Sequence, residues 1–164
     1  MSELAVVAAG PGDLDEVGTI FLEYQQALGV NLCFQGFDEE LAALPGAYAP
    51  PRGALLLLWS DDMLAGCAGL RPLSGENRSE MKRLYVRPAF RGRGGGRRLA
   101  EAVIEAARRA GYARICLDTL EQMAEARALY AGLGFREIPA YYDNPLAGVR
   151  YYELDLARSL ARTG

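Results

Sequence analysis

Apolar residues come in short blocks along the chain, and the spacing within each block predicts a strand or a helix. Strands are expected where compact apolar runs lie between glycine, proline or acidic residues. These runs cover residues 4–8, 54–59, 64–70, 81–86, 115–117, 135–138 and 151–156. Only four residues separate the second run from the third, which predicts an antiparallel hairpin. The last run alternates, with Tyr152, Leu154 and Leu156 on one face and Tyr151, Glu153 and Asp155 on the other.

Apolar residues at helical spacing predict four helices between these runs. The first is expected at residues 13–28, with Asp13 as its N-cap and Glu16 as the capping-box partner. The second is expected at residues 38–44. The other two are marked by apolar faces, made of Leu99, Val103, Ile104 and Ala107 in the third and of Ala126, Leu129, Tyr130 and Leu133 in the fourth. A glycine follows each of these two faces and ends the helix.

The order of these elements predicts an α/β fold in which helices cover both faces of one mixed sheet. The proline-rich segment 45–51 and the polar segment 71–79 are expected to be loops. No linker or internal repeat divides the sequence. Residues 1–164 are therefore expected to form one domain with a single core.

Composition narrows the classes of function. The net charge is −3, so no overall basic field attracts nucleic acid. The chain has no histidine, which excludes a Ser-His-Asp triad, a Cys-His dyad and a histidine-based metal site, and no metal ligand is predicted. Cys33, Cys67 and Cys116 are scattered and are expected to be free thiols. Because neither a secretory signal nor a membrane-length apolar run is visible, a cytoplasmic protein without a membrane partner is expected.

A segment rich in glycine and arginine, residues 91–98, lies between a predicted strand and the third helix. Glycines let backbone amides approach a ligand closely, and the free amides of a first helical turn favour an anion. Arg97 and Arg98 face the positive end of the helix dipole, which disfavours them unless an anion is bound. The segment matches neither a dinucleotide motif nor a P-loop. A phosphate-binding loop and a flexible, solvated loop both remain open at this point.

Two blocks of the sequence resemble motifs of the GNAT superfamily of N-acetyltransferases. Residues 80–99 resemble motif A, whose signature Arg/Gln-x-x-Gly-x-Gly/Ala is matched by Arg91, Gly94 and Gly96. Residues 126–135 resemble motif B. The blocks come in the family's order, joined by a helix and a strand. The resemblance therefore implies a GNAT-like domain with a central, mostly antiparallel twisted sheet.

The resemblance also implies acetyl-CoA as the donor, with its pyrophosphate on the glycine loop and its pantetheine arm along the preceding strand. The residues so implied are Leu84, Tyr85, Val86, Arg91, Gly92, Arg93, Gly94, Gly95, Gly96 and Arg97. Tyr130 matches the family's tyrosine that protonates the departing thiolate, whereas helical spacing alone would make it a core residue. Two positions depart from the family pattern. Met123 stands about where many relatives carry asparagine, and Gly95 where many carry an aliphatic residue.

The reaction implied is direct attack of a small-molecule primary amine on the thioester in a ternary complex. At neutral pH an amine is protonated, so exposing its lone pair costs roughly 4–5 kcal/mol and requires a base. Without histidine, the candidates are carboxylates. Glu80 opens the strand beside the thioester and is predicted to be the base; Asp118 is the alternative, although helix capping would also explain it. The loops that the family places around the acceptor contain Tyr48, Tyr141, Tyr142, Asp143 and Asn144, which would bind an amine or simply pack.

Other functions remain open. An acetyltransferase could act on a protein lysine or N-terminus, and no sequence motif separates this from a small-molecule acceptor. A non-catalytic module that binds acyl-CoA is a second alternative, against which the match at Tyr130 counts. Nucleic-acid binding is disfavoured because the basic residues form one spot rather than a stripe. Dimers are common in the family, so the resemblance allows a homodimer.

Overall fold

The computed structural model describes residues 3–29, 36–75 and 77–157. Within them, seven strands form one sheet in the order β1-β2-β3-β4-β5-β7-β6, and only the β4–β5 pair is parallel. The strands are β1 (Leu4–Ala8), β2 (Ala54–Ser60), β3 (Met63–Leu73), β4 (Arg78–Val86), β5 (Arg114–Leu120), β6 (Arg136–Ile138) and β7 (Val149–Asp155). The predicted antiparallel hairpin of β2 and β3 is confirmed.

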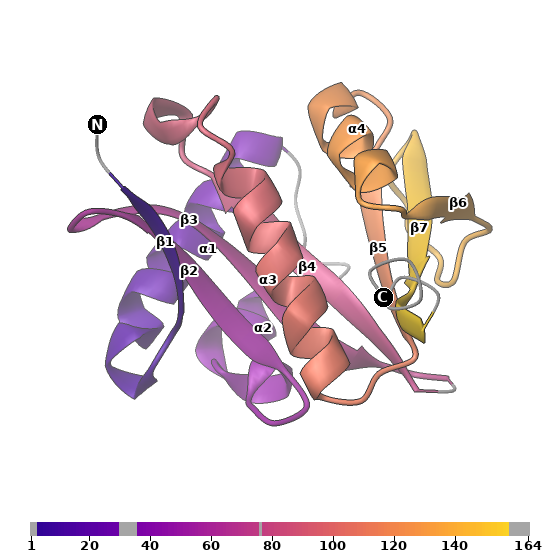
Figure 1. Ribbon diagram of the computed structural model, residues 1–164, viewed down its shortest axis with the longest axis horizontal. Helices are drawn as coiled ribbons and strands as arrows, with labels where there is room; N and C mark the ends of the chain where they lie inside the picture. The colour runs from indigo at the N-terminus through magenta and orange to yellow at the C-terminus, as the bar shows by residue number, and fades with distance from the viewer. Residues whose placement is uncertain (1–2, 30–35, 76, 158–164) are drawn as a thin grey trace.

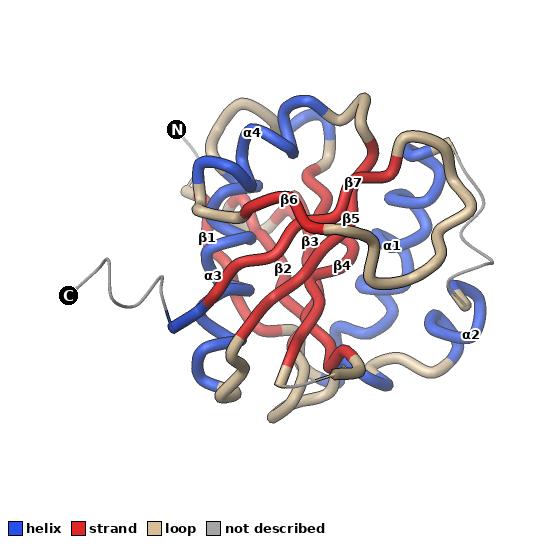
Figure 2. Tube along the Cα trace, turned by 90° about the vertical axis from the view of Figure 1, so that its right-hand side faces the viewer, coloured by secondary structure: helices blue, strands red, loops and turns tan. Residues whose placement is uncertain are grey.

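Helices lie on both faces of the sheet, as predicted. They are α1 (Leu14–Leu28), α2 (Phe37–Ala42), α3 (Gly95–Arg109) and α4 (Ala124–Gly132). Figure 1 shows the order of the elements, and Figure 2 shows α1 and α2 on one side of the strands with α3 and α4 on the other. The central strands β2 and β3 are buried on both faces, which explains why they read as continuous apolar runs.

Two hydrophobic clusters fill the space between the helices and the sheet. The cluster under α3 and α4 contains the predicted helix faces together with Tyr152, Leu154 and Leu156 of the last strand region. The cluster under α1 and α2 is built around Phe21 and Phe37. The alternation predicted for residues 151–156 is therefore confirmed, because the three residues of one face share one cluster.

Three local predictions were wrong. The segment 71–79 is mostly strand, because β3 and β4 extend to a short turn and Arg71 pairs with Glu80 across them. Their opposite charges, with a guanidinium-to-carboxylate distance of 2.9 Å, stabilise this polar end of the hairpin. Asp13 does not cap α1 with its side chain; it accepts a hydrogen bond from the amide of Gly10 at 2.8 Å. The second helix starts at Phe37 and ends at Ala42.

Strands β4 and β5 separate soon after they meet, as Figure 1 shows. They pair only where residues 78–80 face residues 114–116, so residues 81–86 of β4 have no strand partner on that side among the described residues. A register shift between Cys67 and Gly69 adds a bulge, at which Arg83 has a φ of 61°. The bulge interrupts the alternation of side chains between the two faces of β4, next to the point where β4 separates from β5.

Two cysteines are buried in the core and are predicted to be unreactive. Cys67 of β3 and Cys116 of β5 are free thiols. Burial is the main cause that raises the pKa of both, to about 12 for Cys116. At about pH 8, iodoacetamide should leave both unlabelled in the native protein and label both after denaturation, as peptide mass spectrometry would show. Labelling of the native protein at the denatured rate would contradict this. Cys33 lies outside the described residues.

Candidate active site

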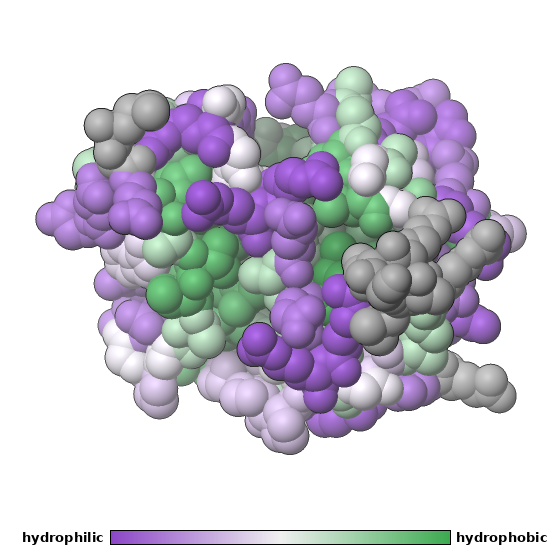
Figure 3. All heavy atoms as spheres, viewed as in Figure 1, coloured by the Kyte–Doolittle hydropathy of each residue, from purple (hydrophilic) through white to green (hydrophobic). Residues whose placement is uncertain are grey.

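A groove of about 570 Å³ lies where β4, the start of α3 and the start of α4 come together. Figure 3 shows hydrophobic surface between α3 and α4 in this region. Eight of the ten residues predicted to bind the donor line the groove, namely Leu84, Tyr85, Val86, Arg91, Gly92, Gly94, Gly95 and Gly96. Arg93 and Arg97 are not among its lining residues. Arg93 donates a hydrogen bond to Ser60, and Arg97 lies 3.9 Å from Glu101 on the same helix.

The glycine end of the groove is suited to an anion. Gly92 and Gly94 both have a φ of 79°, a left-handed conformation that glycine adopts without strain. No side chain caps α3, and its first turn contains no acidic residue, so the free amides there keep their positive field. Arg98 donates a hydrogen bond to the carbonyl oxygen of Leu4 at 2.6 Å, which ties it to β1. The backbone therefore fits a phosphate-bearing ligand better than the arginine side chains do.

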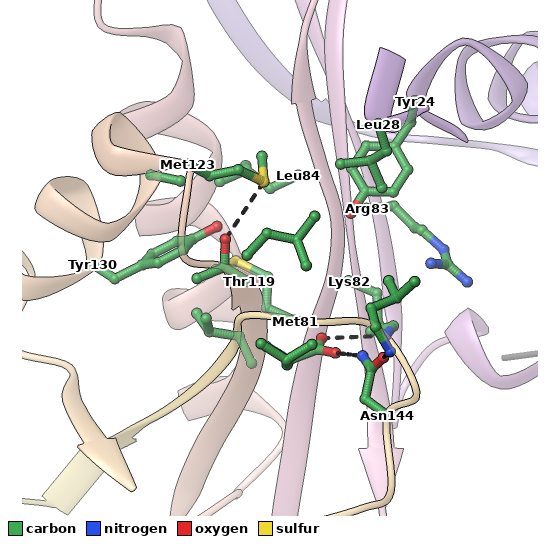
Figure 4. Close-up of a pocket in the computed structure, with 16 residues that line it drawn as sticks. Tyr24, Leu28, Met81, Lys82, Arg83, Leu84, Thr119, Met123, Tyr130 and Asn144 are labelled. Atoms are coloured by element: carbon green, nitrogen blue, oxygen red, sulfur yellow. Dashed lines mark hydrogen bonds and ion pairs between the residues drawn. The ribbon is translucent and has the colours of Figure 1, made fainter. Parts of the chain in front are cut away.

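An inner cavity of about 80 Å³ adjoins the groove, and Leu84, Met123 and Ala126 line both. Figure 4 shows its side chains in two groups. Tyr130, Thr119 and Met123 lie on one side, and Lys82, Arg83, Tyr24 and Asn144 on the other, with Leu84 between them. The side with Met123 therefore adjoins the groove, and the opposite side, with Lys82 and Asn144, is polar.

Tyr130 is buried at the boundary between core and cavity. Its ring packs against Phe135 and Tyr152, with centroid distances of 5.7 and 6.2 Å. Burial is the main cause that raises the pKa of its hydroxyl, so this group stays protonated at neutral pH. It lines the inner cavity and has no hydrogen-bond partner among the residues that the structure describes. Tyr130 is therefore both a core residue, as its helical spacing predicts, and a donor that faces the cavity.

Asp118 and Lys82 form an ion pair on the polar side of the cavity. Lys82 Nζ lies 3.5 Å from Asp118 Oδ1, while Asp118 Oδ2 accepts hydrogen bonds from Asn144, at 3.0 Å, and from Tyr142. Burial lowers the pKa of Lys82, although the charges of Glu80 and Asp118 oppose this shift. Asp118 lies inside β5, and the N-cap of α4 is Met123. Helix capping therefore does not account for Asp118.

Glu80 is buried but does not line either cavity. One of its oxygens accepts a hydrogen bond from Arg71 at 3.0 Å, and the other accepts one from the hydroxyl of Tyr141 at 2.6 Å. Its predicted role as the base stays a prediction. Of the predicted acceptor residues, Tyr48 packs in the core against Phe21, and Asp143 is exposed. The structure brings Asn144 into the cavity, and it brings the hydroxyl of Tyr141 to Glu80 and that of Tyr142 to Asp118.

Sequence reasoning missed several cavity residues, including Tyr24, Lys82, Arg83 and Thr119. Tyr24 belongs to the apolar face of α1 and carries no separate signal of a site. Burial is the main cause that raises its pKa, to about 12. Lys82 and Arg83 could have been noticed, because two adjacent cations inside a strand that packs in the core require partners.

Neither a metal site nor a membrane segment emerges from the described ranges. No group of three or more His, Cys, Asp or Glu side chains there could hold a metal ion. In the same ranges, no helix combines the length and the apolar character needed to cross a bilayer.

Comparison with known proteins agrees with this geometry. The model of the acetyltransferase (GNAT) family matches residues 20–135. An uncharacterized N-acetyltransferase of Schizosaccharomyces pombe is 38% identical over 149 residues, which cover 90% of this chain and 91% of that protein.

Two solved structures share the fold. A Salmonella typhimurium structure, described as an acetyltransferase with its cofactor acetyl-CoA, has a TM-score of 0.69, is 23% identical and covers 93% of this chain and 94% of its own. The spermidine N-acetyltransferase of Vibrio cholerae, in complex with CoA and spermine, has a TM-score of 0.72, is 17% identical and covers 96% and 98%. The family model and the yeast relative together lead to one conclusion: the chain belongs to the GNAT family of acetyl-CoA-dependent N-acetyltransferases.

Proposed function

We propose that this protein transfers the acetyl group of acetyl-CoA to the primary amine of a small molecule, with both substrates bound together. The observation that carries the proposal is the junction of the two cavities at Leu84, Met123 and Ala126. A donor in the groove and an amine in the inner cavity would meet there, which supports direct transfer without an acyl-enzyme.

Different residues of the groove would bind different parts of acetyl-CoA. The free amides at the start of α3 would hold the phosphates, and the unpaired edge of β4 at Leu84 to Val86 offers backbone groups to the pantetheine arm. Acetyl-CoA, when bound, supplies an acetyl group activated as a thioester. Tyr130 would donate a hydrogen bond toward the sulfur, since its raised pKa keeps the hydroxyl protonated. We keep Arg93 and Arg97 as weaker candidates because their side chains have partners elsewhere.

Asp118 is better placed than Glu80 to accept the proton of the amine. Asp118 lines the inner cavity, whereas both oxygens of Glu80 are engaged by Arg71 and Tyr141. A carboxylate has about four lone-pair positions, so Asp118 can accept one more donor beside its present three. Glu80 then acts by holding Tyr141 near the cavity.

The dimensions of the inner cavity favour a short acceptor. Its volume of about 80 Å³ is enclosed by α1 through Tyr24 and Leu28 and by the loop through Asn144 and Leu146. This is well below the ~150 Å³ of a cavity that takes up benzene. The relation to a spermidine N-acetyltransferase supports a small-molecule amine in general. Acetylation of a protein lysine or N-terminus is the alternative.

A substitution at Gly96 tests the groove at a position where the fold accommodates an added Cβ. A Cβ atom at Gly96 would lie 3.8 Å from Leu129 and 3.9 Å from Val86, which are ordinary contacts beside the groove. Gly96→Val should therefore raise the Kd for acetyl-CoA by about ten-fold or more, as calorimetry would measure. Gly18→Val, where a Cβ meets nothing within 4 Å, is the matched control and should bind normally. Equal affinity in the two variants would exclude this groove as the donor site.

The function itself is tested by incubating the protein with acetyl-CoA and a panel of amines and peptides. Mass spectrometry would read free CoA and acetylated products. Acetylation of small amines supports the proposal, and exclusive acetylation of peptides supports the alternative. Absence of acetyl-CoA binding would overturn both, and binding without any product would favour a non-catalytic module.

A further inference from the structure

The ammonium group of Lys82 has unused hydrogen-bonding capacity inside the inner cavity. Its side chain is only 4% exposed, and its one ion-pair partner among the described residues is Asp118 Oδ1, at 3.5 Å. An ammonium carries three donors, and a buried charge is costly unless it is paired and hydrogen-bonded. Lys82 lies on the cavity wall, as Figure 4 shows, so an acceptor group of a bound ligand would face its remaining donors.

The carboxylates around the cavity are already engaged. Asp118 faces Lys82, Tyr142 and Asn144, and Glu80 accepts from Arg71 and Tyr141. Glu40 accepts hydrogen bonds from Nε and Nη2 of Arg83, at 3.1 Å each. Among the lining residues that the structure describes, the cavity therefore has one carboxylate, Asp118, and beside it a cation, Lys82, with donors left over.

We propose, on the basis of the transferase function above, that the acceptor amine carries a carboxylate, which binds Lys82 Nζ. The substrate class is then short amino acids. Their amine would lie toward Asp118 and Leu84, and their carbon skeleton would contact Leu28 or Leu146. A zwitterion matches the paired charges of Lys82 and Asp118, as each end of the substrate meets the opposite sign.

The transfer balances with these groups in place. The acceptor ammonium first loses one proton to Asp118, which passes it to solvent. A bond then forms between the amine nitrogen and the acetyl carbonyl carbon, while the carbon–sulfur bond of the thioester breaks. The second proton of the amine ends on the leaving sulfur. The products are the N-acetylated amino acid, CoA thiol and one proton.

A polyamine fits the same cavity poorly. A second or third ammonium would require further carboxylates, yet Asp118, which would face the first ammonium, is the one carboxylate among the described lining residues. Lys82 and Arg83 would repel the added positive charge. The inference therefore separates this chain from a transferase for polyamines, although the fold is shared.

The test compares acids with neutral analogues of the same size. The probes are glycine, β-alanine and γ-aminobutyrate, each with its carboxamide, and spermidine as the polyamine. For wild type, kcat/KM for at least one acid should exceed that for its carboxamide by about ten-fold or more. In Lys82→Met, which keeps the length of the side chain, this ratio should fall to about one. Calorimetry of the same pairs on the CoA-saturated protein gives a binding readout that needs no turnover.

The outcomes separate this inference from the function on which it rests. The acid-to-carboxamide ratio is internal to each variant, so partial unfolding of Lys82→Met does not mimic the result. Arg109→Met removes an exposed cation at the end of α3 and should keep the wild-type ratio. Equal use of acids and carboxamides, a preference for spermidine, or no use or binding of any acid would overturn the inference. Failure to bind acetyl-CoA would instead overturn the transferase function.

Discussion

Tyr130→Phe should lower kcat by about a hundred-fold or more while leaving the Kd for acetyl-CoA nearly unchanged. The substitution removes one hydroxyl that faces the inner cavity, and the ring contacts with Phe135 and Tyr152 remain. Tyr130 does not line the groove, so donor binding should be preserved. The measurement is steady-state release of CoA with the best acceptor from the panel, together with calorimetry of acetyl-CoA.

Tyr112→Phe is the matched control for the loss of a buried phenolic hydroxyl. The hydroxyl of Tyr112 donates a hydrogen bond to the carbonyl oxygen of Arg52 at 2.7 Å, outside both cavities. This variant should lose about 1 kcal/mol of stability and keep its turnover. If Tyr130→Phe turns over as fast as wild type, the hydroxyl has no part in the reaction, and Tyr130 is a core residue alone.

Glu40→Ala should lower the free energy of unfolding by about 3–5 kcal/mol, because it leaves the buried guanidinium of Arg83 without its carboxylate. Arg83 is 1% exposed and Glu40 10% exposed, and two hydrogen bonds of 3.1 Å join them. The pair links the short helix α2 to β4 at the bulge. Urea denaturation followed by circular dichroism measures the change, and the Tm should fall by roughly 10 °C.

Glu39→Ala provides the control on the same helix. Glu39 is exposed, so its truncation should change stability by no more than about 0.5 kcal/mol. Similar losses in the two variants would show that the buried ion pair contributes little. The double variant Glu40→Leu with Arg83→Met should recover part of the loss, since no buried charge is left without its partner.

The sequence predicts those parts of the candidate site that depend on neighbours along the chain, and the structure places them at the two cavities. The glycine loop is predictable because several glycines at the start of a helix indicate a backbone that can approach a ligand closely. Gly92, Gly94 and Gly96 all line the groove. Tyr130 was identified by its place in a short motif, and it does face the inner cavity. The glycine loop and the motif that contains Tyr130 are each formed by residues close together in the sequence.

The choice between Glu80 and Asp118 could not be made in the same way. Both are strand carboxylates, and only side chains from distant segments decide their roles. Tyr141 and Arg71 engage Glu80, and Lys82 and Asn144 meet Asp118. The loop predicted for residues 71–79 is wrong for a related reason, since its charges are stabilised by pairing across the hairpin.

The order of strands and helices, the hairpin, the amphipathic faces and the glycine loop can be predicted from the amino-acid sequence, because they follow from periodicity and backbone preference. The inner cavity cannot, because it arises from contacts between distant segments. The early separation of β4 from β5, the bulge at Arg83 and the loop with Asn144 together create the inner cavity. These features depend on contacts between residues far apart in the chain. The free energy of such contacts cannot be predicted from the local sequence pattern.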